Sequence, residues 1–127
     1  MTHTPAGAMP EDIPRLMVER GTLHIPTLVV QGDYARFIDK PALLDSPLLT
    51  RIAGADTVAL FKVAPQGEIA GFIQWQRAAL PTNAASVKAL AAAGVPMVTG
   101  TDAGNPGVFQ GYSVHRELRL LVEAGLP

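Results

Sequence analysis

Asp102 is the residue best placed to do chemistry, because it follows a short apolar run and opens a loop rich in glycine and proline. The run covers residues 95–101, and the loop after it contains Gly104, Asn105, Pro106 and Gly107. A strand that ends in this way delivers a side chain to the mouth of an α/β fold. There a carboxylate can bind a divalent metal or move a proton. Alternatively, the carboxylate of Asp102 only caps the turn and accepts hydrogen bonds from the backbone amides of Gly104 or Asn105.

The three histidines are the other candidates. His115 lies near the start of a predicted helix, where it is either a substrate contact, a group that supports the site, or an exposed side chain without a role. His24 falls within a predicted strand, and such a histidine is more often packed and hydrogen-bonded than a ligand. His3 precedes Thr4-Pro5 at the start of the sequence. By pattern alone it is a terminal residue without a function.

The secondary structure predicted around these residues alternates between helices and short apolar strands. The strands are predicted at 23–30 and 95–101, where nearly continuous apolar runs are typical of parallel strands buried on both faces. Pro26 removes one donor from the first strand. Helices are predicted at 10–20, 33–39, from Ser46-Pro47 onward, 68–79, 84–93 (capped by Asn83) and 113–124. This order predicts an α/β fold in one unit.

The motif around Asp102 also carries a resemblance. It combines Gly-Thr-Asp-Ala-Gly at 100–104 with the downstream Ser113-x-His115-x-Glu117-Leu118. This stretch resembles the eighth-strand region of the amidohydrolase superfamily, and within it the imidazolonepropionase-like and prolidase-like enzymes. Residues 25–28, Ile-Pro-Thr-Leu, resemble the seventh strand of these enzymes, in which a proline is normal. His3 falls where their sixth-strand metal-binding histidine would fall.

The resemblance implies part of a (β/α)8 barrel, roughly strands six to eight with their helices, over residues 1–127. It implies a divalent metal bound by Asp102 and His3, with zinc as the first candidate. It also makes Asp102 the group that carries a proton from metal-bound water to the leaving nitrogen, with His115 in contact with the substrate or supporting the site. The implied reaction is hydrolysis of carbon–nitrogen bonds in small amide-type molecules, either non-peptide amides or dipeptides.

Several features of that family are missing from the chain. The first-strand His-x-His pair, the fourth-strand lysine and the fifth-strand histidine are absent, so two ligands remain where a catalytic zinc normally keeps three. We therefore expect a fragment or truncated homologue of a metal-dependent hydrolase that is inactive alone. Self-association, or a separate barrel half, would have to complete it. The alternative is a non-catalytic remnant that acts as an assembly or binding partner.

The composition and charge of the sequence argue against two classes of binding partner, nucleic acids and membrane surfaces. The 127 residues are 48% hydrophobic and 17% charged, with a formal net charge of −1 and no cysteine. No basic block predicts nucleic-acid binding, and no basic amphipathic helix predicts binding to a membrane surface. The start of the sequence lacks the basic and apolar regions of a signal peptide. We therefore expect a cytoplasmic protein.

Overall fold

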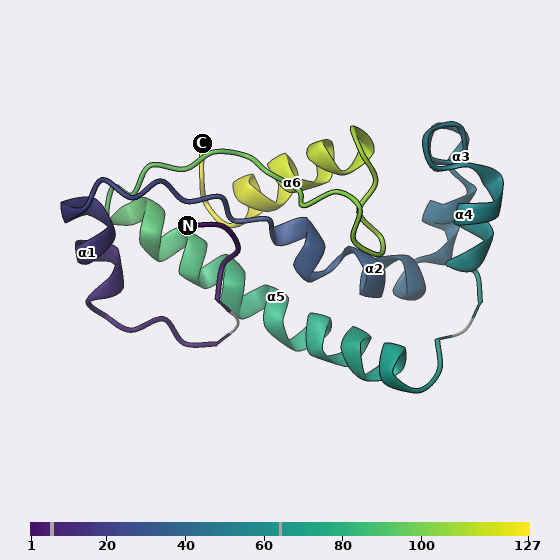
Figure 1. Cartoon of the computed structure of the whole chain (residues 1–127), viewed down its shortest axis with the longest axis horizontal. Helices are drawn as coiled ribbons and strands as arrows, with labels where there is room; N and C mark the ends of the chain where they lie inside the picture. The colour runs from purple at the N-terminus through teal and green to yellow at the C-terminus, as the bar shows by residue number, and fades with distance from the viewer. Residues whose placement is uncertain (6, 64) are drawn as a thin grey trace.

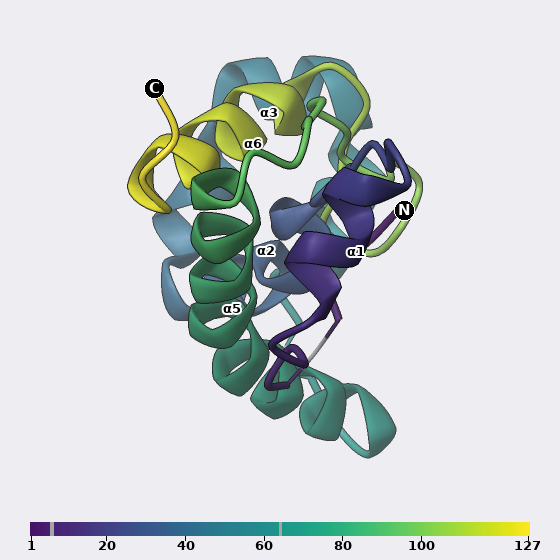
Figure 2. The same cartoon turned by 90° about the vertical axis from the view of Figure 1, so that its left-hand side faces the viewer.

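The computed structural model describes residues 1–5, 7–63 and 65–127, and helices dominate it. In chain order the elements are α1 (Ile13–Glu19), η1 (Leu28–Gln31), α2 (Asp33–Asp39), η2 (Pro41–Asp45), α3 (Pro47–Ala53), α4 (Ala55–Leu60), α5 (Glu68–Ala92) and α6 (Tyr112–Glu123), where η marks a 3₁₀-helix. The longest helix, α5, runs along one side of the molecule and α6 along the other, while α3 and α4 stand together at one end (Figure 1). Seen from the opposite end, α1 lies beside the last turns of α5 (Figure 2).

The main core forms where η1 passes between α5 and α6. Leu28 and Val29 of η1 are fully buried against Val87 of α5 and Leu120 and Leu121 of α6. A second cluster joins α2, η2, α3 and α4, and a third joins α1 to the end of α5. The apolar residues that the sequence assigned to a strand at 28–30 are thus buried by helices on two sides.

Several helices were predicted correctly. The helix after Ser46 begins at Pro47, and the Ser46 hydroxyl accepts a hydrogen bond from the Leu49 amide at 3.3 Å, which caps the first turn. The helices predicted at 33–39 and 113–124 are observed at Asp33–Asp39 and Tyr112–Glu123.

The two helices predicted at 68–79 and 84–93 are a single helix. Asn83 was expected to cap the second of them, but it is fully buried inside α5 and its amide donates to Gln31 Oε1 at 2.8 Å. Pro81 also lies within α5 and does not end it. The buried partner of Asn83 explains why this residue is polar without being a cap. Although α5 spans 25 residues, no helix in the described residues is long and apolar enough to cross a membrane.

The predicted partial (β/α)8 barrel is wrong, because the described residues form no sheet. Residues 23–30 contribute only single bridges at His24 and Ile25 and then turn into η1, and residues 95–101 contribute one bridge at Met97. A short apolar run does not distinguish a strand from another buried segment. Prolines at 26 and 96 each lack a ladder donor. Leu28 and Val29 are instead buried between α5 and α6, and Val95 packs against α1 and α5.

Three extended segments nevertheless lie side by side. The bridge between Thr2 and Ile25 and that between His24 and Met97 are both parallel. His3 N donates to the carbonyl of Ile25 at 3.0 Å, and His24 N donates to that of Pro96 at 2.9 Å. The segment around residue 25 is therefore in the middle, and residues 3, 27 and 102 follow the paired positions of the three segments.

Candidate functional site

His3, Thr27 and Asp102 meet where the three extended segments end. His3 Nδ1 lies 2.8 Å from Thr27 Oγ1, and His3 Nε2 lies 3.8 Å from Asp102 Oδ2. The side chains of His3 and Asp102 are 48% and 41% exposed, whereas Thr27 is buried. The structure thus brings together two residues that are 99 positions apart in the sequence, and it leaves both accessible to a ligand.

The backbone at this site is strained. Among the described residues, the only non-glycine residues with a positive φ are His3 (65°), Thr27 (54°) and Asp102 (55°). Asp tolerates this left-handed region, but a β-branched Thr does so at a cost on the order of 1–2 kcal/mol. The side chain of His3 lies against both Thr27 and Asp102. Strain of this kind concentrates at functional sites.

The hydrogen bonds of Thr27 determine which nitrogen of His3 carries the proton. The single hydroxyl proton of Thr27 donates to the Pro26 carbonyl at 2.7 Å. Thr27 Oγ1 must therefore accept from His3, so Nδ1 of neutral His3 carries its proton. Nε2 then presents a lone pair toward Asp102 Oδ2. Two lone pairs facing each other repel, and a cation between them removes that repulsion.

These two atoms fit a metal only in part. Zinc ligands at roughly 2.0–2.2 Å from the ion would lie roughly 3.4 Å apart at a tetrahedral angle, close to the 3.8 Å observed. No group of three or more His, Cys, Asp or Glu side chains that could hold a metal occurs among residues 1–5, 7–63 and 65–127. The pair can therefore supply two ligands, but the described residues do not complete a catalytic zinc site.

Asn105 fixes the carboxylate of Asp102. Its side-chain amide donates to Asp102 Oδ2 at 2.8 Å and to the Asp102 carbonyl at 3.0 Å. The expected turn cap is wrong in its donors, because the backbone amides of Gly104 and Asn105 donate to the carbonyls of Val108 and Asp102 instead. Asp102 Oδ1 makes no hydrogen bond within the described part of the chain, so one oxygen is held while the other is available.

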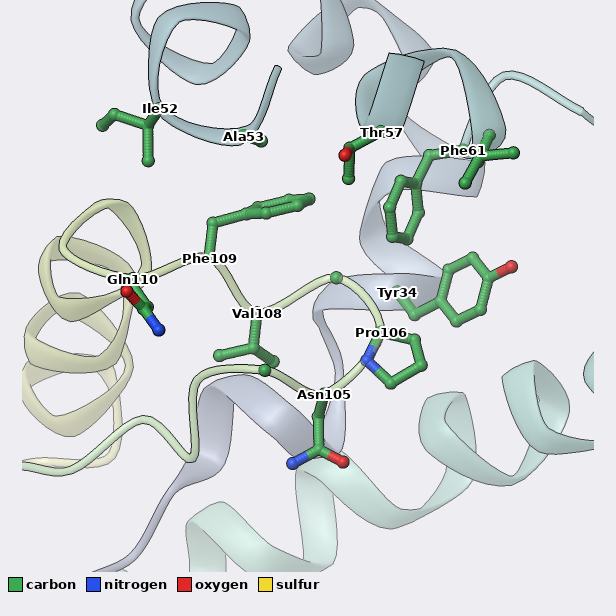
Figure 3. A pocket seen from close by; sticks show the side chains of 13 residues that line it. Tyr34, Ile52, Ala53, Thr57, Phe61, Asn105, Pro106, Val108, Phe109 and Gln110 are labelled. Atoms are coloured by element: carbon green, nitrogen blue, oxygen red, sulfur yellow. The ribbon is translucent and has the colours of Figure 1, made fainter. Parts of the chain in front are cut away.

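An apolar pocket of about 520 Å³ opens beside this loop. Asn105 lines it, but its side chain points away from the aromatic rings of Tyr34, Phe61 and Phe109 (Figure 3). These rings pack edge to face, with centroids 5.0 Å apart for Tyr34 and Phe61 and 5.5 Å apart for Phe61 and Phe109. Gly107 lets the loop pack this closely, since a Cβ there would lie 2.9 Å from the Tyr34 backbone nitrogen. Asn105 therefore connects an apolar pocket of ligand size to the polar pair.

Glu117 is a buried anchor that the sequence did not reveal. It lies on α6, is fully buried and accepts hydrogen bonds from the amides of Leu28 (3.0 Å) and Val29 (2.7 Å). Burial raises the pKa of Glu117, and the bonds from these amides oppose that rise. It caps the first amides of η1, directly after Thr27, and so helps to hold the turn that forms the site. Helical spacing alone could not have shown this role.

His24 supports the N-terminal segment, as expected of a packed and hydrogen-bonded histidine. It is fully buried, its Nε2 lies 3.2 Å from Thr4 Oγ1, and its Nδ1 lies 3.1 Å from the Met1 carbonyl. Burial lowers the pKa of His24, which favours the neutral ring. Gln31 Nε2 also donates to the Thr4 carbonyl at 3.3 Å. His3 is therefore tied down through its neighbours despite its position near the terminus.

The structure does not bring His115 to the pair. It is exposed on α6 and lines a different pocket, with Arg36, Tyr112 and Arg119. No hydrogen bond or ion pair joins it to His3 or Asp102 within the described residues. Its expected role beside Asp102 therefore has no contact to support it.

Comparisons with known proteins returned no matching family, no matching curated protein and no matching solved structure.

Proposed function

We propose that this chain contributes His3 and Asp102, as a pair of divalent-metal ligands, to a hydrolase of the amidohydrolase kind that acts on carbon–nitrogen bonds. The observation that carries the proposal is the 3.8 Å approach of His3 Nε2 to Asp102 Oδ2, with the proton of His3 held on Nδ1 by Thr27. A Zn²⁺ ion in such a hydrolase supplies hydroxide at neutral pH. Asp102, half exposed and fixed by Asn105, is the group that would accept and return a proton.

The apolar pocket beside Asn105 gives the substrate a place. Its rings and aliphatic side chains suit the apolar part of a small amide-type molecule, with the amide directed to Asp102. The third ligand would come from a second copy of the chain or from another polypeptide. We accordingly expect no appreciable turnover by the isolated chain, because two ligands bind metal weakly and an open site weakens its electrostatics.

Zinc titration followed by NMR tests the pair. We expect Zn²⁺ to shift the ring signals of His3 more than those of His115, an exposed histidine that serves as an internal control. His3→Ala and Asp102→Asn should each remove the response, whereas His115→Ala and Asp12→Asn should leave it intact. Equal responses from both histidines, or a response that survives Asp102→Asn, would disprove the pairing.

An activity assay tests the incompleteness of the site. The panel contains N-acyl amino acids, dipeptides, lactones and cyclic amides, with zinc or manganese supplied. We expect no turnover above background. Turnover that Asp102→Asn abolishes would contradict the argument from ligand number and would indicate a site assembled from two chains. An adjacent coding region with a His-x-His pair would support the hydrolase, and co-expression should then give activity that depends on Asp102.

A non-catalytic role in assembly is the second candidate. Ile69, Phe72 and Trp75 lie on the first half of α5 and are 48%, 40% and 44% exposed, and the rings of Phe72 and Trp75 stack at 5.7 Å. Exposed apolar clusters of this kind mark interaction surfaces. A second copy bound there should make the chain a dimer in sedimentation analysis and Trp75→Gln a monomer. A wild-type monomer at high concentration would exclude this candidate.

A further inference from the structure

A second pocket, away from His3 and Asp102, collects cationic side chains. It measures about 300 Å³ and lies between α6, α2 and the start of α3. Its lining residues are Arg36, Leu48, Tyr112, His115, Arg116 and Arg119. Three of the seven arginines of the chain thus converge on one pocket, in a protein whose formal net charge is −1. No carboxylate belongs to the lining.

The arginines differ in how far their charge is already compensated. Arg36 Nη1 lies 3.2 Å from buried Asp33, and Arg116 lies 3.6 Å from Asp33 and 3.3 Å from Glu123. Asp33 holds both Arg36 and Arg116, Glu123 holds Arg116, and neither acid belongs to the pocket lining. Arg119 and His115 make no ion pair or hydrogen bond within the part of the chain that the structure describes. Two oriented guanidinium groups therefore stand beside two donors that have no partner.

The acids beside the pocket offset only part of its positive charge, because two carboxylates stand against three guanidinium groups. Burial raises the pKa of Asp33 to about 6, against the opposing effect of Arg36 and Arg116. At neutral pH the acids that face the group are Asp33 and Glu123, and the basic residues are three arginines and His115. The pocket therefore keeps a net positive charge, which favours an anion. Guanidinium groups bind phosphate and carboxylate oxygens through paired N–H donors.

We propose that this pocket binds the phosphate group of a small phosphate ester. The phosphate oxygens accept hydrogen bonds from Arg36, His115 and Arg119. A dianion is favoured over a single carboxylate because more donors converge than one carboxylate can use. Leu48 and the ring of Tyr112 form the apolar part of the lining and contact the organic group of the ester. The pocket volume of about 300 Å³ limits the ligand to a small molecule.

The test uses phenyl phosphate, inorganic phosphate, benzoate and sodium chloride at matched ionic strength, with the ring signals of His115 as the readout. Phenyl phosphate should bind at least about tenfold more tightly than either inorganic phosphate or benzoate, and chloride should produce no saturable shift. Equal binding of phenyl phosphate and inorganic phosphate would overturn the ester. Equal binding of benzoate would overturn the phosphate, and an equal effect of chloride would overturn the site.

Three variants test whether phenyl phosphate binds in this pocket. Arg119→Gln removes an exposed side chain without an ion pair, so the fold should persist, and affinity for phenyl phosphate should fall by at least about tenfold. Arg20→Gln, at an exposed arginine after α1, is the matched control and should bind like the wild type. Asp102→Asn should also leave binding unchanged, which separates this pocket from the proposed hydrolase. Equal affinities of Arg119→Gln and Arg20→Gln would disprove the proposal.

Discussion

Glu117 and Asp102 are both carboxylates that hold a turn after an extended segment, but their surroundings differ. Glu117 is fully buried and its two oxygens accept from two backbone amides. Asp102 is 41% exposed, and one of its oxygens accepts from a side-chain amide. Backbone donors cannot leave, so Glu117 is committed to the fold. The partners of Asp102 are side chains at the surface, so its charge is available to a ligand.

Substitutions at Glu117 should have the largest effect on the free energy of unfolding. Glu117→Ala leaves the amides of Leu28 and Val29 buried without acceptors, and we expect it to lower the free energy of unfolding by about 3–5 kcal/mol. Glu117→Gln keeps one acceptor and should cost about 1–2 kcal/mol. Urea unfolding measures both values. A cost below about 1 kcal/mol for the alanine variant would show that η1 does not depend on this anchor.

The next largest effect is expected at buried Asp33, as a dependence of the free energy of unfolding on pH. Its pKa rises from 3.8 in the unfolded chain to about 6 in the fold because of burial, so the folded state binds the proton more tightly. Its contribution to stability is therefore full below pH 3.8 and is lost as pH rises through about 6. The loss is at most about 3 kcal/mol. The raised pKa of Glu117 acts in the same direction.

Unfolding of the wild type and of Asp33→Asn between pH 3.5 and 7 measures this effect. The decline between about pH 4 and pH 6 should become shallower in the variant. Asp39→Asn is the control, because Arg77 lowers the pKa of this exposed carboxyl and its effect has the opposite sign. A wild-type stability that rises steadily over this range would contradict the assignment.

Gln76 extends the comparison to a neutral buried anchor. Its side chain accepts from the Ala35 amide at 2.9 Å and donates to the Val30 carbonyl at 2.8 Å. Gln76→Leu leaves both groups without a partner and should lower the free energy of unfolding by about 2 kcal/mol. Gln74→Leu, at an exposed position on the same helix, should change it by less than about 0.5 kcal/mol. Similar costs at both positions would show that the two buried hydrogen bonds of Gln76 do not stabilise the fold.

Asp102 should show the smallest effect on stability. Asn tolerates a positive φ, and the 3.8 Å contact between the half-exposed side chains of His3 and Asp102 adds little to stability. We expect Asp102→Asn to change the free energy of unfolding by less than about 0.5 kcal/mol while it removes the zinc response of His3. Urea unfolding and the zinc titration are measured on the same sample. A stability loss comparable to that of Glu117→Ala would make Asp102 a structural residue.

Local signals in the sequence predicted much of the helical part. Ser46 followed by proline predicted the start of α3, and the spacing of apolar residues predicted α6, because both depend on neighbours within a few positions. The strands at 23–30 and 95–101 were predicted wrongly, because an apolar run reports burial and not the partner that buries it. Leu28 and Val29 are buried against α5 and α6, whereas Val95 packs against α1 and α5 and Val98 is 42% exposed.

Residue type and immediate context were enough to predict that Asp102 opens a glycine-rich loop and that His24 is a packed residue. The resemblance to amidohydrolases also led us to expect His3 and Asp102 at one site, and the structure places their side chains 3.8 Å apart. The contacts of Thr27 and the burial of Glu117 became visible only in the folded chain. These facts depend on where distant segments meet. Side-chain chemistry is local, but the dielectric surroundings and partners that give a carboxylate its role are set by packing.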